Sequence, residues 1–216
     1  MKTLKTWLIT TALVLTSNIA TADNMYSPAE LIEQMKQGGL VIYIRHARTE
    51  IDYADQVTAD PNNCSTQRTL SEAGWQDAVT IGNAFSFYGI PANKILSSQY
   101  CRAWQTAYLA FERYKKREKL NFLPFEDYTP EQILLMQQRV MPFLTRPVAN
   151  GKNRVIVAHD DPFEAATGIY PEPMGSAYLV KPDNAGGFEV LGCIAPDGWS
   201  TLDGQTNECN MTPTSY

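Results

Sequence analysis

The sequence contains only two histidines, and each of them directly follows a short hydrophobic run. His46 follows "LVIYIR" (residues 40–45), and His159 follows "RVIVA" (residues 154–158). Short runs rich in β-branched residues, such as these, predict buried strands. In open α/β sheets, ligands bind at the carboxyl ends of the strands. We therefore expect both imidazoles to lie in one ligand-binding pocket.

Arginine side chains are expected at the same pocket. Arg45 directly precedes the first histidine, Arg48 follows it, and Arg102 comes shortly after a third predicted strand, residues 94–98. Arginine is always charged, and its planar set of N–H donors matches phosphate oxygens. A neutral imidazole nitrogen can attack phosphorus as a nucleophile. The combination predicts phosphoryl transfer, in which fixed positive charge stabilises the equatorial phosphoryl oxygens.

Helices and strands alternate along the chain, and this order predicts the fold class. Capping signals and 3.6-residue periodicity predict helices, and β-branched runs predict strands. The helices are expected at residues 27–39, 70–90, 100–114 and 129–144, and the strands at residues 40–44, 94–98, 154–158, 176–182 and 187–194, the last two as a hairpin-like pair. Residues 46–68 predict a long polar loop of the kind that often carries function, and the basic run 113–119 predicts a solvated helix end. The result is an α/β fold, a three-layer α/β/α sandwich around a mostly parallel sheet.

Four segments resemble the motifs of the histidine phosphatase superfamily, which has the phosphoglycerate-mutase-like fold. "VIYIRHARTE" resembles its Arg-His-Gly signature, and "QRTLSEAGWQDAVTIGNAF" is similar to its R-x-L-[ST]-x-x-G helix start. "ILSSQYCRAWQTAYLAF" is similar to S-S-x-x-x-R-A-x-Q-T-A, and "VIVAHDDPFEAATG" resembles the second-histidine segment. The four blocks stand in the family's order and span roughly residues 38–182. The resemblance implies that residues 23–216 form a single histidine phosphatase domain.

The resemblance also implies a role for each residue of the pocket. His46 is the expected nucleophile that becomes phosphorylated. Arg45, Arg102 and His159 are the expected remaining residues of the phosphate pocket, and Arg48 is a further candidate for substrate binding. No cofactor and no metal is implied.

The sequence departs from the family pattern at two positions. Ala47 stands where the family usually has glycine, which is a modest change unless that residue needs a positive φ. Arg48 is one residue too close to the histidine to reproduce the R-H-G-x-R pattern of the acid-phosphatase branch. The first change leaves the charged groups of the expected pocket intact.

The proton donor to the leaving group has several candidates. In the acid-phosphatase branch an aspartate directly after the second histidine has this role, and Asp160 holds that place here. Glu164, one helical turn further on, is an alternative donor. In the other branch the acid comes from the segment after the second arginine, where Glu112, Glu126 and Asp127 are available. Asp160 is the first choice.

The N-terminal segment predicts export. Residues 1–22 contain Lys2 and Lys5, an apolar stretch from Trp7 to Leu15, and a final A-x-A site, as a signal peptide requires. This apolar stretch is too short to span a bilayer, so we expect no membrane insertion after cleavage. Loss of the two lysines changes the formal net charge from −5 to −7. An acidic protein repels nucleic acid, so a small phosphorylated substrate is the expected partner of a periplasmic or secreted enzyme.

The four cysteines of an exported chain predict two disulfides, for which three pairings are possible. We favour Cys64–Cys101 and Cys193–Cys209. The first pair would place a covalent bond beside Arg102, and we hypothesise that it preorganises the phosphate pocket. The alternative is that this bond only stabilises the fold.

The leading interpretation is an exported, metal-independent phosphomonoesterase that acts through a phosphohistidine. One alternative is a catalytically silent phosphate- or sugar-phosphate-binding protein on the same fold. Another is a divalent metal site formed by His46, His159 and Asp160, although adjacent arginines would repel the ion. The residues select neither a sugar, a nucleotide nor a phosphoprotein as the substrate, nor an oligomeric state.

Overall fold

The computed structural model describes residues 26–57, 59–125, 127–183, 185–200 and 208–214. The predicted signal peptide, residues 1–22, and the candidate donor Glu126 lie outside the described residues. Within those ranges, no helix has the length and apolar character needed to cross a membrane.

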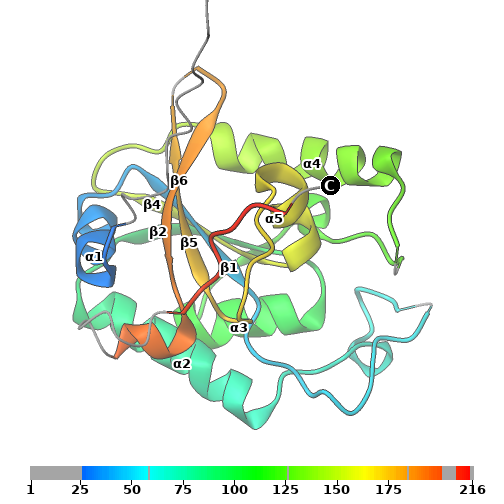
Figure 1. Cartoon of the computed structure of the whole chain (residues 1–216). Helices are drawn as coiled ribbons and strands as arrows, with labels where there is room; N and C mark the ends of the chain where they lie inside the picture. Colours follow the sequence, from blue (N-terminus) through cyan, green and yellow to red (C-terminus); the bar gives the residue numbers. More distant parts are fainter. Residues whose placement is uncertain (1–25, 58, 126, 184, 201–207, 215–216) are drawn as a thin grey trace, which may run out of the picture.

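A six-stranded sheet forms the middle of the molecule (Figure 1), with the strand order β3-β2-β4-β1-β5-β6. The strands are β1 (Leu40–Arg45), β2 (Ala92–Ser97), β3 (Lys115–Lys116), β4 (Asn153–Ala158), β5 (Ala177–Pro182) and β6 (Phe188–Ile194). The pairs β3–β2, β2–β4 and β4–β1 are parallel, whereas β5 is antiparallel to β1 and β6 is antiparallel to β5. The prediction of a mostly parallel sheet with a terminal antiparallel pair is confirmed.

Helices cover both faces of this sheet (Figure 1). They are α1 (Pro28–Gln37), α2 (Glu72–Phe87), α3 (Cys101–Phe111), α4 (Pro130–Thr145) and α5 (Asp160–Thr167). Along β1, Ile42 and Ile44 pack in the cluster with α1, α2 and α3, whereas Val41 and Tyr43 pack in the cluster with α4 and α5. The predicted three-layer α/β/α sandwich is therefore confirmed.

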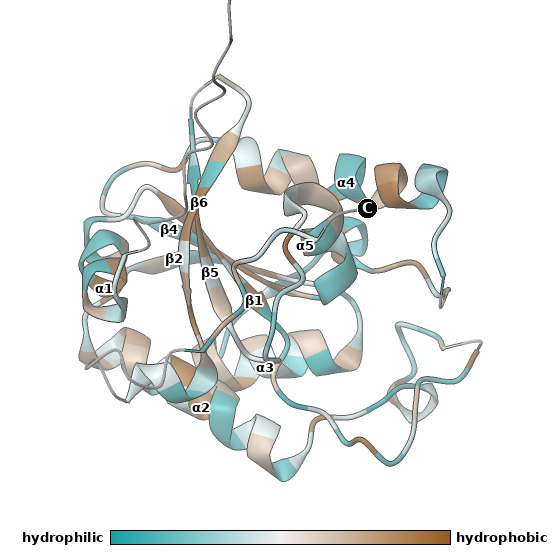
Figure 2. Cartoon of the chain, in the orientation of Figure 1, coloured by the Kyte–Doolittle hydropathy of each residue, from teal (hydrophilic) through white to brown (hydrophobic). Residues whose placement is uncertain are grey.

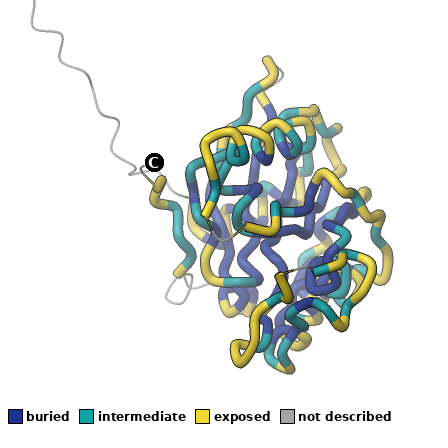
Figure 3. The backbone as a smooth tube through the Cα atoms, turned by 90° about the vertical axis from the view of Figure 1, so that its right-hand side faces the viewer, coloured by how far each residue is buried: buried dark blue, intermediate teal, exposed yellow. Residues whose placement is uncertain are grey.

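Burial follows this layering. Every residue of β1 and β4 is buried, which explains why both strands read as continuous apolar runs rather than alternating ones. The buried residues form the interior of the molecule in Figure 3, and apolar residues run along the strands in Figure 2. The loop at residues 46–68 is largely hydrophilic in Figure 2, as predicted.

One local prediction was wrong. The basic run at residues 113–119 is not the end of a helix, because α3 ends at Phe111 and Glu112 follows with a left-handed φ of 57°. A left-handed residue at this position is a common helix stop. The run instead contains β3, whose exposed Lys115 and Lys116 lie at the edge of the sheet. Charged side chains on an edge strand discourage pairing with a second sheet.

Both favoured disulfides are present. Cys64 is bonded to Cys101, so the 46–68 loop is joined to the first residue of α3. Cys193 on β6 is bonded to Cys209 in the C-terminal segment. The first bond lies one residue before Arg102, as the sequence predicted.

Candidate active site

The carboxyl ends of β1, β4 and β2 bring the two histidines together. Because β4 lies between β1 and β2, His159 at its end lies between His46 and Ser98, which follow the other two strands. The His46 backbone N–H donates to the Ala158 carbonyl at 2.9 Å, and the two imidazole rings lie 5.5 Å apart, centre to centre. Both histidines are 1% exposed. The structure therefore brings both imidazoles together at the carboxyl ends of the strands, and their place in one ligand-binding pocket stays a prediction.

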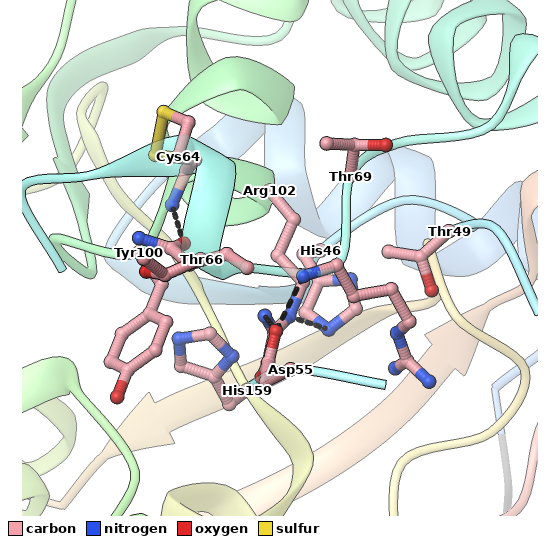
Figure 4. Close-up of polar contacts among 12 residues, drawn as sticks. His46, Thr49, Asp55, Cys64, Thr66, Thr69, Tyr100, Arg102 and His159 are labelled. Atoms are coloured by element: carbon pink, nitrogen blue, oxygen red, sulfur yellow. Dashed lines mark hydrogen bonds and ion pairs between the residues drawn. A yellow bond between two sulfur atoms is a disulfide. The ribbon is translucent and has the colours of Figure 1, made fainter. Parts of the chain in front are cut away.

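The tautomer of His46 follows from its two partners. Its Nδ1 lies 2.9 Å from the carbonyl oxygen of Ala47, which can only accept, so Nδ1 carries the hydrogen. Its Nε2 accepts a hydrogen bond from Arg102 Nε at 3.1 Å, as Figure 4 shows. Burial, with Arg102 and Arg45 close by, lowers the pKa of His46 well below its usual value. The Nε2 atom therefore has a lone pair at neutral pH, as a nucleophile requires.

Arg102 lies between His46 and the 46–68 loop (Figure 4). Besides its bond to the histidine, its Nη1 contacts Asp55 Oδ1 at 3.0 Å. Its guanidinium lies over the rings of Tyr100 and Phe122, at 5.4 Å and 5.2 Å from their centroids. The arginine is thus a buried cation that contacts His46 Nε2.

Arg45 forms a second buried ion pair. Its Nη2 contacts Asp160 Oδ2 at 2.5 Å, and its Nη1 donates to the carbonyl of Pro171 at 2.8 Å. Tyr170 donates its hydroxyl to the same Asp160 oxygen at 2.8 Å and places its ring under the guanidinium. Burial alone would raise the pKa of Asp160, but the Arg45 cation and the hydrogen bond from Tyr170 outweigh it and the pKa is lowered. In the ligand-free site, Asp160 is therefore a carboxylate.

His159 is fixed in the tautomer opposite to that of His46. Its Nε2 lies 2.7 Å from Ser98 Oγ. Ser98 gives its own hydrogen to Asn121 Oδ1, so its oxygen accepts from His159, and Nε2 carries the hydrogen. Burial, followed by the cations Arg102 and Arg45, lowers the pKa of His159 well below its usual value. Its Nδ1 is buried with no partner among the described residues.

A third arginine belongs to this site and was not chosen from the sequence. Arg68 is half-buried, its Nε has no partner among the described residues, and its pKa is lowered by burial and by Arg102. Its charge also acts on Asp55, Asp160 and Arg45. The sequence did carry a signal for Arg68 as a site residue, because it is the arginine of the R-x-L-[ST]-x-x-G block. Asp55 had no such signal in the sequence.

Two helices begin at the site. α3 starts at Cys101 and α5 starts at Asp160, and neither has a side-chain cap on its first turn. The N-terminus of a helix carries partial positive charge and free N–H groups, which favour anions. Asp160 and Asp161 lie in the first turn of α5, where this partial charge favours carboxylates, and His159 is the N-cap residue.

The remaining predicted residues lie further from the histidines. Arg48 contacts Asp77 through Nε at 2.6 Å and Nη2 at 2.5 Å, and it lines a cavity of about 590 Å³ together with Arg45. Glu164 accepts from Thr214 Oγ1 at 2.9 Å and lines a separate cavity.

Two of the alternative acids can be placed as well. Asp127 lines the same cavity as Glu164 and Asp161. Glu112 is at the far end of α3, ten residues after Arg102, which corresponds to about 15 Å along a helix. The structure therefore brings Asp160, and not Glu112, to the histidine pair.

Asp161 follows Asp160 in the first turn of α5. Burial and the neighbouring Asp160 raise the pKa of Asp161 to about 7.

Ala47 is accommodated without strain. Glu112 is the only non-glycine residue in the described ranges with a positive φ, so Ala47 has an ordinary backbone conformation. Its N–H donates to Thr106 Oγ1 at 3.0 Å, and its carbonyl fixes the His46 ring. A glycine is not needed at this position.

No family model matches the sequence, and no curated protein matches it. Solved structures do match the fold. The protein histidine phosphatase SixA complexed with tungstate aligns with a TM-score of 0.52 at 15% identity, covering 73% of this chain and 97% of that chain. A mycobacterial glucosyl-3-phosphoglycerate phosphatase complexed with VO3 aligns with a TM-score of 0.52 at 17% identity, covering 71% and 97%. The mycobacterial hydrolase 1 gives 0.52 at 17% identity, covering 70% and 96%. The chain therefore has the phosphoglycerate-mutase-like fold of the histidine phosphatases.

Proposed function

We propose that this protein is an exported, metal-independent phosphomonoesterase that acts through a phosphohistidine on His46. One observation carries the proposal: the Nε2 lone pair of a neutral, buried histidine lies beside buried arginines at the carboxyl ends of parallel strands. The printed titles of the structural neighbours name phosphatases, and two of them were solved with the oxyanions tungstate and VO3. These names support a phosphate ester as the substrate class.

The site offers enough positive charge to bind a phosphoryl dianion without a metal. Arg45 and Arg102 are buried and face the histidine pair, and Arg68 adds a third guanidinium. Buried N–H donors act strongly on developing negative charge because water does not screen them. Arg45 Nε and Arg68 Nε are two such donors without a partner among the described residues.

The proposed reaction has two steps. In the first, His46 Nε2 attacks phosphorus, the bond to the leaving oxygen breaks, and Asp160 gives that oxygen a proton. In the second, water attacks the phosphohistidine, Asp160 takes the proton from the water, and phosphate is released. Arg45, Arg102 and His159 hold the phosphoryl oxygens throughout.

The protonation of Asp160 changes with the ligand. The ligand-free site keeps Asp160 ionised through Arg45. A bound dianion competes with Asp160 for the Arg45 guanidinium, and its negative charge repels the carboxylate. Both effects raise the pKa of Asp160. Substrate binding therefore favours the protonated form that the first step needs.

The proposal also covers the location of the protein and the place where the leaving group binds. The signal-like segment at residues 1–22 and the two disulfides favour a periplasmic or secreted location. Arg48 and Arg45 line the same cavity beside the phosphate pocket. This cavity is our candidate for the place of the leaving group.

The test is hydrolysis of an aryl phosphate by residues 23–216 with excess chelator. We expect turnover that the chelator does not reduce, and no turnover in His46→Ala. Rapid denaturation in alkali during turnover should trap a protein-bound phosphate that is stable in alkali and lost in acid, as a phosphoramidate is. Activity that needs a divalent metal, or that survives in His46→Ala, would contradict the mechanism.

A catalytically silent binding protein remains the alternative function. The ion pairs on Arg45 and Arg102 give it some support, because both arginines are occupied in the ligand-free site. Phosphate binding by calorimetry, without turnover of aryl and sugar phosphates, would favour this alternative.

A further inference from the structure

The Arg102 guanidinium connects the proposed nucleophile to a carboxylate on the 46–68 loop. We propose that Asp55 is a further determinant of substrate binding, whose carboxylate occupies Arg102 until the phosphoryl group of the substrate displaces it. The inference rests on the proposed function, because it concerns the same phosphate pocket.

The contacts place Asp55 where a phosphoryl oxygen has to be. Arg102 uses Nη1 for Asp55 Oδ1 at 3.0 Å and Nε for His46 Nε2 at 3.1 Å. One planar group therefore holds the carboxylate beside the nitrogen that attacks phosphorus (Figure 4). Phosphate and carboxylate oxygens match the same N–H edge of a guanidinium.

Attack on phosphorus also requires this arrangement to change. The lone pair of His46 Nε2 is directed at Arg102 Nε–H, and it must be directed at phosphorus for the reaction. Arg102 can turn towards the phosphoryl oxygens only if it gives up its present partners. A dianion and Asp55 on one buried guanidinium would also repel each other, since charges are poorly screened there.

Asp55 is the partner that can leave. Its side chain is 21% exposed, compared with 6% for that of Arg102. It lies in a segment without helix or strand, and two apolar side chains near it are not packed: Ile51 is 85% exposed and Val57 is 94% exposed. The Arg102 contact and a 2.6 Å hydrogen bond from the Arg68 N–H to Asp55 Oδ1 hold the carboxylate at the site.

The second ion pair at the site differs in this respect. Asp160 is part of α5, so the helix fixes its backbone. A hydrogen bond from the Tyr170 hydroxyl also holds its carboxylate. Asp55 alone is carried by a loop. We therefore expect substrate to move the middle of the 46–68 loop, while Asp160 stays in place as the proton donor.

Binding of inorganic phosphate to residues 23–216 by calorimetry tests the proposal. Asp55→Asn keeps the shape of the side chain and the oxygen that accepts from Arg68, but it removes the charge. A competitor that occupies Arg102 for about nine-tenths of the time weakens apparent affinity about tenfold. We expect Asp55→Asn to bind phosphate about tenfold more tightly than the unmodified chain. Asp52→Asn, an exposed loop acid three positions earlier, is the control for general charge and should change affinity little.

Weaker phosphate binding by Asp55→Asn would overturn the proposal. If Asp55 instead holds Arg102 in the orientation that binds phosphate, Asp55→Asn binds more weakly and KM for an aryl phosphate rises. Competition predicts that KM falls. Equal affinity in both proteins would also contradict it.

Hydrogen exchange of the loop gives an independent readout. In the unmodified chain, phosphate should speed exchange at the Arg68 amide, because its acceptor Asp55 moves away. Slower exchange there would contradict displacement. Failure of the proposed function remains distinguishable: tighter phosphate binding in Asp55→Asn without any turnover of aryl phosphate would keep this inference and reject the enzyme.

Discussion

His46 Nε2 and Arg102 Nε share a 3.1 Å hydrogen bond, so the proposed nucleophile and a proposed phosphate ligand are in direct contact in the ligand-free site. A permanent cation at this distance opposes protonation of the imidazole. The same contact hides the lone pair until an anion draws Arg102 away. The neutral state of His46 and the position of Arg102 thus depend on each other.

Stability should fall in mild acid. Burial and Arg102 lower the pKa values of His46 and His159 well below 6.5, whereas in the unfolded chain they lie near 6.5. Below about pH 6.5 the unfolded chain binds protons that the native state excludes, so the free energy of unfolding decreases. The contribution of these groups is full above that pH, and the loss is at most about 1.4 kcal/mol per pH unit for each histidine.

Urea unfolding between pH 5 and pH 7.5 measures this dependence. His159→Gln should reduce the slope relative to the unmodified chain. Asp161, whose pKa is raised to about 7, takes up a proton on folding over the same range and opposes the effect of the histidines. The measurement is therefore repeated in Asp161→Asn, where a free energy of unfolding that does not change between about pH 5 and 6.5 would mean that the native histidines are protonated.

Anion binding should take up a proton. His159 donates through Nε2 to Ser98, so its Nδ1 can donate to a phosphoryl oxygen only when the ring is cationic. A bound dianion raises the pKa of this ring. Calorimetry with sulfate, which stays a dianion, in buffers of different ionisation enthalpy near pH 7 should show uptake of up to about one proton. Asp160 also takes up a proton when an anion binds, so the comparison is made in the Asp160→Asn background. There His159→Gln should abolish the uptake, and buffer-independent heats would refute the prediction.

Asp160→Asn should act according to the leaving group. An asparagine cannot give a proton to an alkoxide, so kcat for an alkyl phosphate should fall by about 10²- to 10⁴-fold. An aryl phosphate with a good leaving group needs less help and should lose less. Tyr170→Phe, which removes only the hydroxyl bonded to Asp160, is the milder control. Equal losses on both substrates would assign Asp160 to binding through Arg45.

Arg48→Ala should separate a structural role from a binding role. One edge of this guanidinium, formed by Nε and Nη2, contacts both carboxylate oxygens of Asp77, whose side chain is 6% exposed, while the arginine side chain is 45% exposed. Loss of the arginine leaves a buried carboxylate without its partner, and because the arginine is half-exposed we expect a cost of about 1–2 kcal/mol in unfolding. Thermal unfolding and KM would be measured together. A raised KM with unchanged stability would make Arg48 a substrate ligand.

Removal of the Cys64–Cys101 bond should weaken the phosphate pocket. The bond spans 37 residues and joins the loop to the residue before Arg102. In the chain-entropy model it contributes about 3–4 kcal/mol of stability. We expect the double serine variant to be less stable. In the Asp55→Asn background, where no loop carboxylate competes for Arg102, it should also bind phosphate more weakly, because the start of α3 is no longer tied to the loop.

The matched control is the double serine variant of Cys193 and Cys209, whose bond spans 16 residues. It should lose stability with a smaller change in phosphate affinity. Equal losses of affinity in the two variants would assign both bonds to general stapling of the fold.

The sequence by itself determined the layers and the position of the site. Strand periodicity and the continuous apolar runs of β1 and β4 follow from residue type, because strands buried on both faces carry apolar side chains on both. Two histidines at strand ends predicted one pocket, since parallel strands end at one edge. The pattern failed where local sequence was ambiguous: Lys115 and Lys116 resemble a helix end, but pairing with β2 makes them an edge strand.

The tertiary structure alone decided how the charges pair. Arg48 and Arg102 look equivalent in the sequence, yet one contacts Asp77 and the other contacts His46 and Asp55. Partners such as Arg102 and Asp55 are 47 residues apart, so no local pattern relates them. The tautomers of both histidines are likewise fixed by a carbonyl and a hydroxyl brought near by folding. Residue type therefore set the available chemistry, and long-range packing set which groups are free to perform it.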